Sequence, residues 1–116
     1  MERDIIILNL LIGWEIIHFS KTRKKLCFRL REFPDKHSRF FRISFDKCTL
    51  AEILDFSQGQ TEDLSSFNFE GCIFAQVKME NDRIINIQLL KKSELVGALK
   101  TVSSKITYNS TAKWGR

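Results

Sequence analysis

Few residues of this chain could carry out acid–base chemistry, because it contains only two histidines, His18 and His37. His37 follows Asp35 in a short polar segment, so its imidazole could act as a general base that the carboxylate orients. The same segment, residues 34–38, also has the composition of a solvated turn. His18 has hydrophobic neighbours on both sides, which favours a structural histidine within a strand. Glycine-rich phosphate loops, nucleophile elbows, zinc-protease motifs and EF-hand spacing are all missing from the sequence, so we expect no enzyme and no cofactor.

The three cysteines, Cys27, Cys48 and Cys72, also lack the spacing of a reactive or metal-binding site. A zinc site wants a Cys-x-x-Cys pair or nearby histidine ligands, and neither accompanies these residues. An odd number of cysteines without a close pair favours buried free thiols in a reducing compartment. We therefore expect no metal site and no disulfide framework.

The apolar residues near the N-terminus, at positions 5–8 and 10–12, are too few to cross a bilayer, which takes about 20. A signal peptide would need a basic start and a small-residue cleavage site. Here the charges of residues 2–4 roughly cancel, and bulky Trp14 follows the run. The sequence predicts a buried element at this place and a cytoplasmic protein without a membrane segment.

Positive charge is concentrated in one stretch. Residues 21–47 carry ten basic and three acidic side chains, a net charge of +7, which exceeds the +5 of the whole chain. Alternation in two predicted strands puts Arg29 and Arg31 on one outward face, and puts Arg42 and Phe40 on the next. The candidate partner-binding residues are Lys21, Arg23, Lys24, Lys25, Arg29, Arg31, Arg39, Phe40 and Arg42.

Such a basic face has three interpretations. Phosphates are attracted to it and an exposed Phe can stack on a base, which would suit a nucleic acid. Acidic protein surfaces are attracted equally well. The lysines and arginines could also simply keep a solvated sheet from aggregating. The ribonucleoprotein-type aromatic motif and the GXXG loop are absent, so the sequence favours a non-catalytic protein-binding domain whose partner has an acidic or apolar surface, with a nucleic-acid-binding module as the alternative.

Alternation with a period of two residues predicts the strands that position these side chains. It predicts strands over residues 14–19, 25–31, 39–45, 72–79, 84–90 and 102–108, with residues 20–24 and 80–83 as hairpin turns. In the third of these strands Ser44 faces outward, and in the fourth Ile73 and Ala75 face inward. The expected core consists of Ile16, Leu26, Phe28, Leu30, Phe41, Ile43, Phe45, Ile73, Val77, Ile85, Ile87 and Leu89.

Two segments allow either a helix or a strand. Residues 49–56 begin with a capping box from Thr49 to Glu52, typical of a short helix, yet they could form an irregular strand. Residues 93–99 contain good helix formers, although Gly97 weakens a helix there. Residues 57–66 read as a polar loop. The sequence as a whole predicts a mainly β fold, a twisted antiparallel sheet or small sandwich of about six or seven strands with one or two short helices, and an α+β fold is the alternative.

One domain is expected over residues 1–109, followed by a flexible C-terminal tail at 110–116. The elements of this domain follow a recognisable order in the segments Gly13–Phe19, Leu26–Leu30, Arg42–Cys48, Ile53–Phe56 and Asn68–Phe74, with a hairpin after the last. This order resembles that of the small β-rich immunity proteins that bacteria encode beside polymorphic or contact-dependent toxins. The resemblance covers residues 13–90 and rests on hydrophobic spacing and a few polar residues.

The resemblance implies a protein that binds and blocks a toxin, and it carries over no catalytic residue. Immunity proteins against cationic nucleases tend to be acidic, whereas this chain is basic. If the resemblance holds, the toxin's contact surface should therefore be acidic or apolar.

Overall fold

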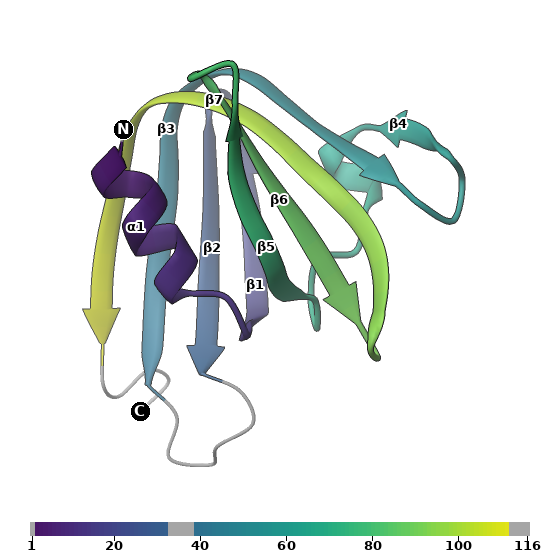
Figure 1. The fold of residues 1–116 in the computed structure, drawn as a ribbon, viewed down its shortest axis with the longest axis horizontal. Helices are drawn as coiled ribbons and strands as arrows, with labels where there is room; N and C mark the ends of the chain where they lie inside the picture. The colour runs from purple at the N-terminus through teal and green to yellow at the C-terminus, as the bar shows by residue number, and fades with distance from the viewer. Residues whose placement is uncertain (1, 33–38, 112–116) are drawn as a thin grey trace.

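The computed structural model describes residues 2–32 and 39–111 and confirms a mainly β fold (Figure 1). Its elements are α1 (Glu2–Leu10), β1 (Trp14–Thr22), β2 (Lys25–Glu32), β3 (Phe40–Asp55), β4 (Gln60–Glu62), β5 (Ile73–Glu80), β6 (Ile84–Lys91) and β7 (Glu94–Thr111), with a 3-10 turn at Leu64–Ser66. The predicted strands all exist, and the two predicted hairpins are β1–β2 and β5–β6.

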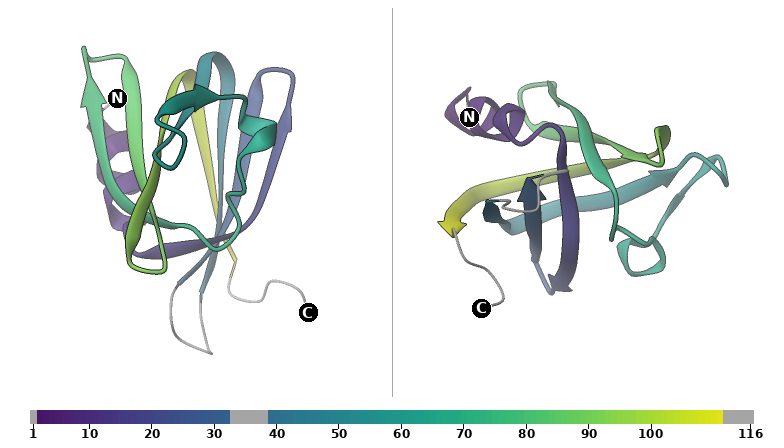
Figure 2. Two further views of the ribbon diagram at one scale, coloured as in Figure 1. Left: turned by 90° about the vertical axis from the view of Figure 1, so that its right-hand side faces the viewer. Right: turned by 90° about the horizontal axis from the view of Figure 1, so that it is seen from below.

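The seven strands form one antiparallel sheet in the order β2-β1-β5-β6-β7-β3-β4, and β2 also pairs with β3. The pairings of β1, β2, β3, β7, β6 and β5 therefore make a closed cycle, and β4 extends the edge of β3. Only Glu15 and Ile73 are paired between β1 and β5. Beyond this point the β1–β2 and β5–β6 hairpins spread apart (Figure 2).

The two longest strands, β3 with 16 residues and β7 with 18, connect the two halves of the molecule. The first half of β3 pairs with both β2 and the end of β7, whereas its second half pairs with the start of β7 and with β4. A register shift between Cys48 and Leu50 lies next to Lys47, whose φ is 52°. Such a bulge bends a strand, and β3 and β7 curve together over the molecule (Figure 1).

Aromatic rings fill the centre of the core. The ring of Phe28 lies 6.0 Å from that of Phe45, 5.6 Å from that of Phe69 and 6.1 Å from that of Phe74. The helix α1 packs against β5, beside the β5–β6 hairpin (Figure 2), and Leu8 is buried. The expected core residues are buried, except that Phe41 and Ile73 are only half-buried.

Both segments that allowed a helix are strands. Residues 49–55 continue β3, and residues 94–99 begin β7. Each has hydrogen-bonded neighbours, since Ile53 is paired with Leu99 on one side and with Glu62 on the other. Pairing and burial override the local helix signals of the capping box and of the helix-forming residues.

The predicted orientation of Ile73 in β5 is wrong. A register shift between Phe74 and Gln76 adds a residue to this strand, so Phe74 and Val77 are buried while Ile73 is half-buried. Ser44 alternates with the buried Ile43 and Phe45, as predicted for an outward residue, but it is only 5% exposed. It lies in a central strand, opposite Cys27 of β2 and Thr107 of β7.

Regular structure extends into two segments that were predicted to lack it, the loop at residues 57–66 and the start of the tail at residues 110–116. Residues 57–66 include β4 and the 3-10 turn, which Asp63 caps by accepting a hydrogen bond from the Ser65 amide. At the other end of the chain, β7 runs to Thr111, and Ser110 is paired with Phe41. Residues 112–116 lie outside the described residues.

Candidate functional site

The β1–β2 hairpin and β3 bring four of the candidate partner-binding residues together. In the register of β2 and β3, Arg29 is directly opposite Arg42, and Arg31 is opposite Phe40. These positions alternate with the buried residues of both strands, so all four side chains are on the outer side of the sheet. We call this surface, formed by Arg29, Arg31, Phe40 and Arg42, the β2–β3 face.

Carboxylates at the borders of the β2–β3 face reduce its positive charge. Arg31 Nη2 donates a hydrogen bond to Glu15 Oε1 on β1, with a distance of 2.7 Å. At the other border, Lys25 Nζ lies 3.9 Å from Asp46 Oδ1. The surface is therefore less positive than the sequence alone suggests.

Lys21 and Arg39 lie away from this face. Lys21 is opposite the buried Leu26, and its Nζ is 3.8 Å from an oxygen of Asp63. Arg39 donates two hydrogen bonds to Glu32, from Nε at 3.1 Å and from Nη2 at 2.9 Å. These bonds and the charge of Arg39 lower the pKa of the Glu32 carboxyl.

Arg23 and Lys24 form the tip of the β1–β2 hairpin, between the paired Thr22 and Lys25. Both tip residues are exposed. The nine candidate residues thus fall into three groups: the β2–β3 face with Lys25 at its border, the hairpin tip, and the separately paired Lys21 and Arg39.

His18 is the histidine among the described residues, and the acidic side chain near it is that of Glu70. His18 is half-exposed, because a register shift follows Ile16, and its Nδ1 lies 4.0 Å from a carboxylate oxygen of Glu70. His37 and Asp35 lie outside the described residues. Residues 2–32 and 39–111 contain no cluster of three metal-binding side chains. In the same ranges no helix has the length and apolar character needed to cross a membrane.

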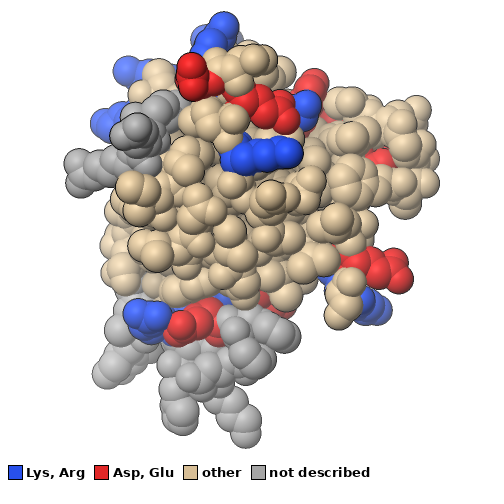
Figure 3. Space-filling view, in the orientation of Figure 1, with Lys and Arg blue, Asp and Glu red and all other residues tan. Residues whose placement is uncertain are grey.

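In the middle of the face shown in Figure 3, the described residues present few charged side chains. On α1, Ile6 and Leu10 are 62% and 71% exposed. Charged residues are instead concentrated around this face, at the strand ends and turns.

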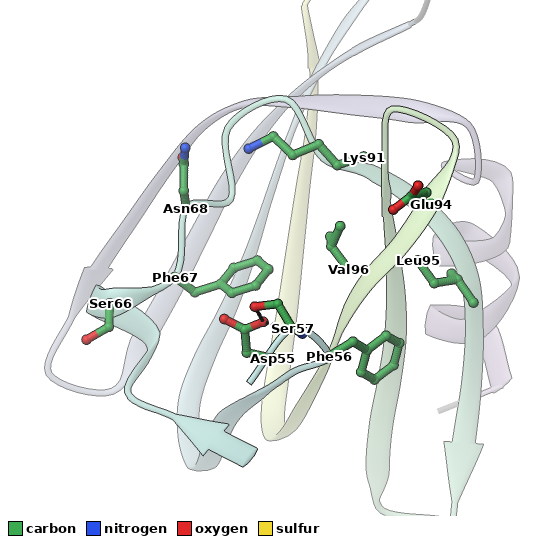
Figure 4. Close-up of a pocket in the computed structure, with 10 residues that line it drawn as sticks. All are labelled: Asp55, Phe56, Ser57, Ser66, Phe67, Asn68, Lys91, Glu94, Leu95 and Val96. Carbon is green, nitrogen blue, oxygen red and sulfur yellow. Dashed lines mark hydrogen bonds between the residues drawn. The ribbon is translucent and has the colours of Figure 1, made fainter. Parts of the chain in front are cut away.

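A pocket of about 450 Å³, which the sequence analysis did not predict, lies at the β3–β4 end of the molecule. Its walls come from the end of β3, from residues 66–68 and from the β6–β7 turn (Figure 4). Phe56, Phe67, Leu95 and Val96 supply apolar surface, and Asp55 contributes a carboxylate. Phe56 and Leu95 are 40% and 47% exposed, so the pocket offers apolar area to a ligand.

Phe67 reaches this position because Gly97 has no side chain. A Cβ atom added at Gly97 would lie 3.2 Å from the Phe67 ring and 3.0 Å from the carbonyl oxygen of Leu54. The ring of Phe67 also lies 4.9 Å from that of Phe69, which continues into the aromatic core. One wall of the pocket is therefore fixed by the core itself.

The acidic groups near the pocket have no ion-pair partner among the residues that the structure describes. Asp55 accepts hydrogen bonds from the amide and hydroxyl of Ser57, at 2.9 and 2.7 Å, and these lower the pKa of its carboxyl. Desolvation and the charge of Asp55 raise the pKa of Glu62. None of the ion pairs between described residues includes Asp55, Glu62 or Glu94.

No family model, curated protein or solved structure matches this chain. The described residues define a small antiparallel β domain, whose sheet closes into a cycle and which has one α-helix, packed against β5. The β2–β3 face and the pocket are the two candidate sites on its surface.

Proposed function

We propose that this protein is a non-catalytic binding domain that recognises another protein through the β2–β3 face. The observation that supports this proposal is the register that puts Arg29 opposite Arg42 and Arg31 opposite Phe40. Directly opposite side chains of a sheet lie close together, so this register gathers two guanidinium groups on one surface, where a partner can contact both. Arginine and aromatic side chains are also the types most often found at protein interfaces.

The partner that suits this face has an acidic or apolar surface. Within the class of binding proteins, the resemblance of residues 13–90 in sequence to bacterial immunity proteins suggests a protein that covers a toxin, a role that needs no catalytic group. All three cysteines are free thiols, which supports a reducing compartment such as the cytoplasm.

A nucleic acid is the alternative partner, because Phe40 shares the face with three arginines and can stack on a base. The sequence lacks the ribonucleoprotein-type aromatic motif and the GXXG loop of common nucleic-acid-binding modules, and this counts against it. We therefore rank a protein partner above a nucleic acid.

The test is to reverse the two opposed charges with Arg29→Glu and Arg42→Glu in one variant. The control variant, Arg83→Glu with Lys92→Glu, makes the same change of charge at two exposed turns. If the gene lies beside one for a secreted protein with a toxic C-terminal domain, that domain is co-expressed with each variant and growth is measured. We expect the parent and the control to restore growth and the β2–β3 variant to fail while remaining folded by circular dichroism.

Fluorescence anisotropy with a mixed-sequence oligonucleotide separates the two partners. Tight binding that weakens steeply with salt, and that only the β2–β3 variant loses, would favour the nucleic-acid alternative. If both variants behave as the parent does in both assays, the β2–β3 face has no binding role and the proposal fails.

A further inference from the structure

The pocket at the β3–β4 end has a chemistry opposite to that of the β2–β3 face. We propose that it receives the side chain of a lysine or arginine presented by a partner protein, with the aliphatic stem against Phe67 and Val96 and the cationic head at Asp55. This inference does not rest on the β2–β3 face, because the two surfaces are formed by different parts of the chain and attract opposite charges.

The walls of the pocket suit the stem of such a side chain. Lysine and arginine combine an aliphatic chain with a charged end, and they bury the chain along apolar surface while the charge stays at a polar group. Phe67 points into the centre of the pocket, and Val96 lies beside it (Figure 4). A volume of about 450 Å³ is within the range of ligand sites in proteins.

The position of Asp55 suits the charged head. Its carboxylate is held in place by the two hydrogen bonds from Ser57 and lies next to the ring of Phe67 (Figure 4). Glu94, on the β6–β7 turn, contributes a second carboxylate to the lining. Two acids in one pocket attract a cation and repel an anionic ligand.

Lys91 is the single cation of the lining and competes with the proposed guest. Its amine points toward Asn68, at the opposite side of the pocket from Asp55 (Figure 4). No ion pair joins Lys91 to Asp55 or to Glu94 among the described residues. The carboxylate of Asp55 therefore keeps its charge available to a ligand.

The acids of the pocket are complementary to a cation in a way that the other acids are not. The protein has a net charge of +5, and Glu15, Glu32, Asp46, Asp63, Glu70 and Glu80 each lie within 4.0 Å of a lysine, arginine or histidine side chain. Glu52, Asp55, Glu62, Asp82 and Glu94 take part in none of these ion pairs, and of these five only Asp55 and Glu94 line the pocket. Their negative charge beside exposed apolar surface is the charge complementarity that argues for a cationic guest from outside the chain.

The test uses three capped amino acids as probes: N-acetyl-arginine amide, N-acetyl-norleucine amide and N-acetyl-glutamate amide. Each is titrated into the isotopically labelled protein, and backbone amide shifts are followed by NMR. We expect the arginine probe to shift the amides of Ser57, Phe67 and Val96 in a saturable manner. The norleucine probe, which has a stem without a charge, should bind several times more weakly, and the glutamate probe should have no localised effect.

Two matched variants check that the carboxylate is responsible. Asp55→Asn keeps an oxygen that can accept the bonds from Ser57 but removes the charge, and we expect binding of the arginine probe to weaken about two- to fivefold. Asp82→Asn removes the same charge at the exposed β5–β6 turn, where its φ of 57° suits asparagine, and should change nothing. Equal binding of the arginine and norleucine probes, shifts located elsewhere, or an Asp55→Asn variant that binds as the parent does would each overturn the proposal.

Discussion

The aromatic ring of Phe67 lies directly against the backbone of Gly97, so closely that a single methyl group at position 97 would come within 3.2 Å of the ring. This contact joins the segment after the 3-10 turn to the first half of β7. It also forms the apolar wall of the pocket, so one packing contact connects the stability of the fold to the shape of the proposed site.

Gly97→Ala should therefore destabilise the protein by about 1–3 kcal/mol, the usual cost of overpacking a filled site. Urea denaturation of the parent and variant measures this loss. In a Phe67→Leu background the same substitution should cost less, because the side chain that it meets is smaller and more flexible. Equal costs in the two backgrounds would show that the carbonyl of Leu54, and not the ring of Phe67, limits the space.

Phe28 is the centre of the aromatic core and is fully buried. Phe28→Ala should lower the free energy of unfolding by about 3–5 kcal/mol, because it leaves a cavity among the rings of Phe19, Phe45, Phe69 and Phe74. Phe56→Ala removes the same atoms from an exposed position at the pocket and should cost about 0.5 kcal/mol or less. Similar losses for the two variants in urea denaturation would contradict the packing described here.

Two glutamates should respond to pH in opposite ways. The pKa of Glu32 lies below its ordinary value of 4.5 because Arg39 donates hydrogen bonds to it. The ionised carboxylate of Glu32 therefore stabilises the folded protein at pH values above 4.5. This stability is lost as the pH falls through the folded-state pKa of Glu32. Glu32→Gln should destabilise the protein at neutral pH and have little effect in strong acid.

The pKa of Glu62 is raised, by desolvation and by the neighbouring charge of Asp55. The protonated form is favoured in the folded state, so stability is greatest below the ordinary value of 4.5 and falls as the pH rises through the folded-state pKa. Glu62→Gln should therefore be neutral in acid and stabilising at neutral pH. Thermal melts of both glutamine variants across the acid range measure these trends, and a shared direction would refute the assignment.

The three thiols should react at different rates. Cys27 is partly exposed on the outer side of β2, whereas Cys48 and Cys72 are buried. Burial also raises the pKa of the Cys72 thiol, which leaves less of the reactive thiolate. In the folded protein a thiol reagent should modify Cys27 first, and mass spectrometry of peptides should find the other two modified only in denaturant. Rapid labelling of Cys72 under native conditions would contradict its position in the core.

The sequence predicted those parts of the fold that depend on local alternation. In β2, the buried Leu26, Phe28 and Leu30 alternate with less buried neighbours. Successive side chains of a strand point to opposite faces, so this alternation predicts a strand with one buried face. The register of β2 against β3, and with it the grouping of Arg29 and Arg42, follows from two such strands lying side by side.

Features that depend on contacts between distant segments could not be predicted. The bulge in β5 reverses the orientation of Phe74, and a period-two pattern has no means to anticipate an inserted residue. In the sequence, Gly97 only weakened a possible helix. Its role, to leave room for the ring of Phe67, depends on a contact with a segment 30 residues away in the sequence. The pocket needs three segments that the sheet brings together, so neither Asp55 nor Leu95 stood out among similar residues of the sequence.

The closed cycle of strands has a consequence for the order of folding. The β1–β2 and β5–β6 hairpins join neighbouring residues and can form early, on the microsecond timescale of isolated hairpins. The cycle closes only when β3 meets β7, and this step pairs Phe40 with Thr111, two residues that are far apart in the sequence. Contacts between such distant residues slow folding. During synthesis on the ribosome, β3 must therefore wait for the last strand to emerge, and until then its edge is exposed to other chains.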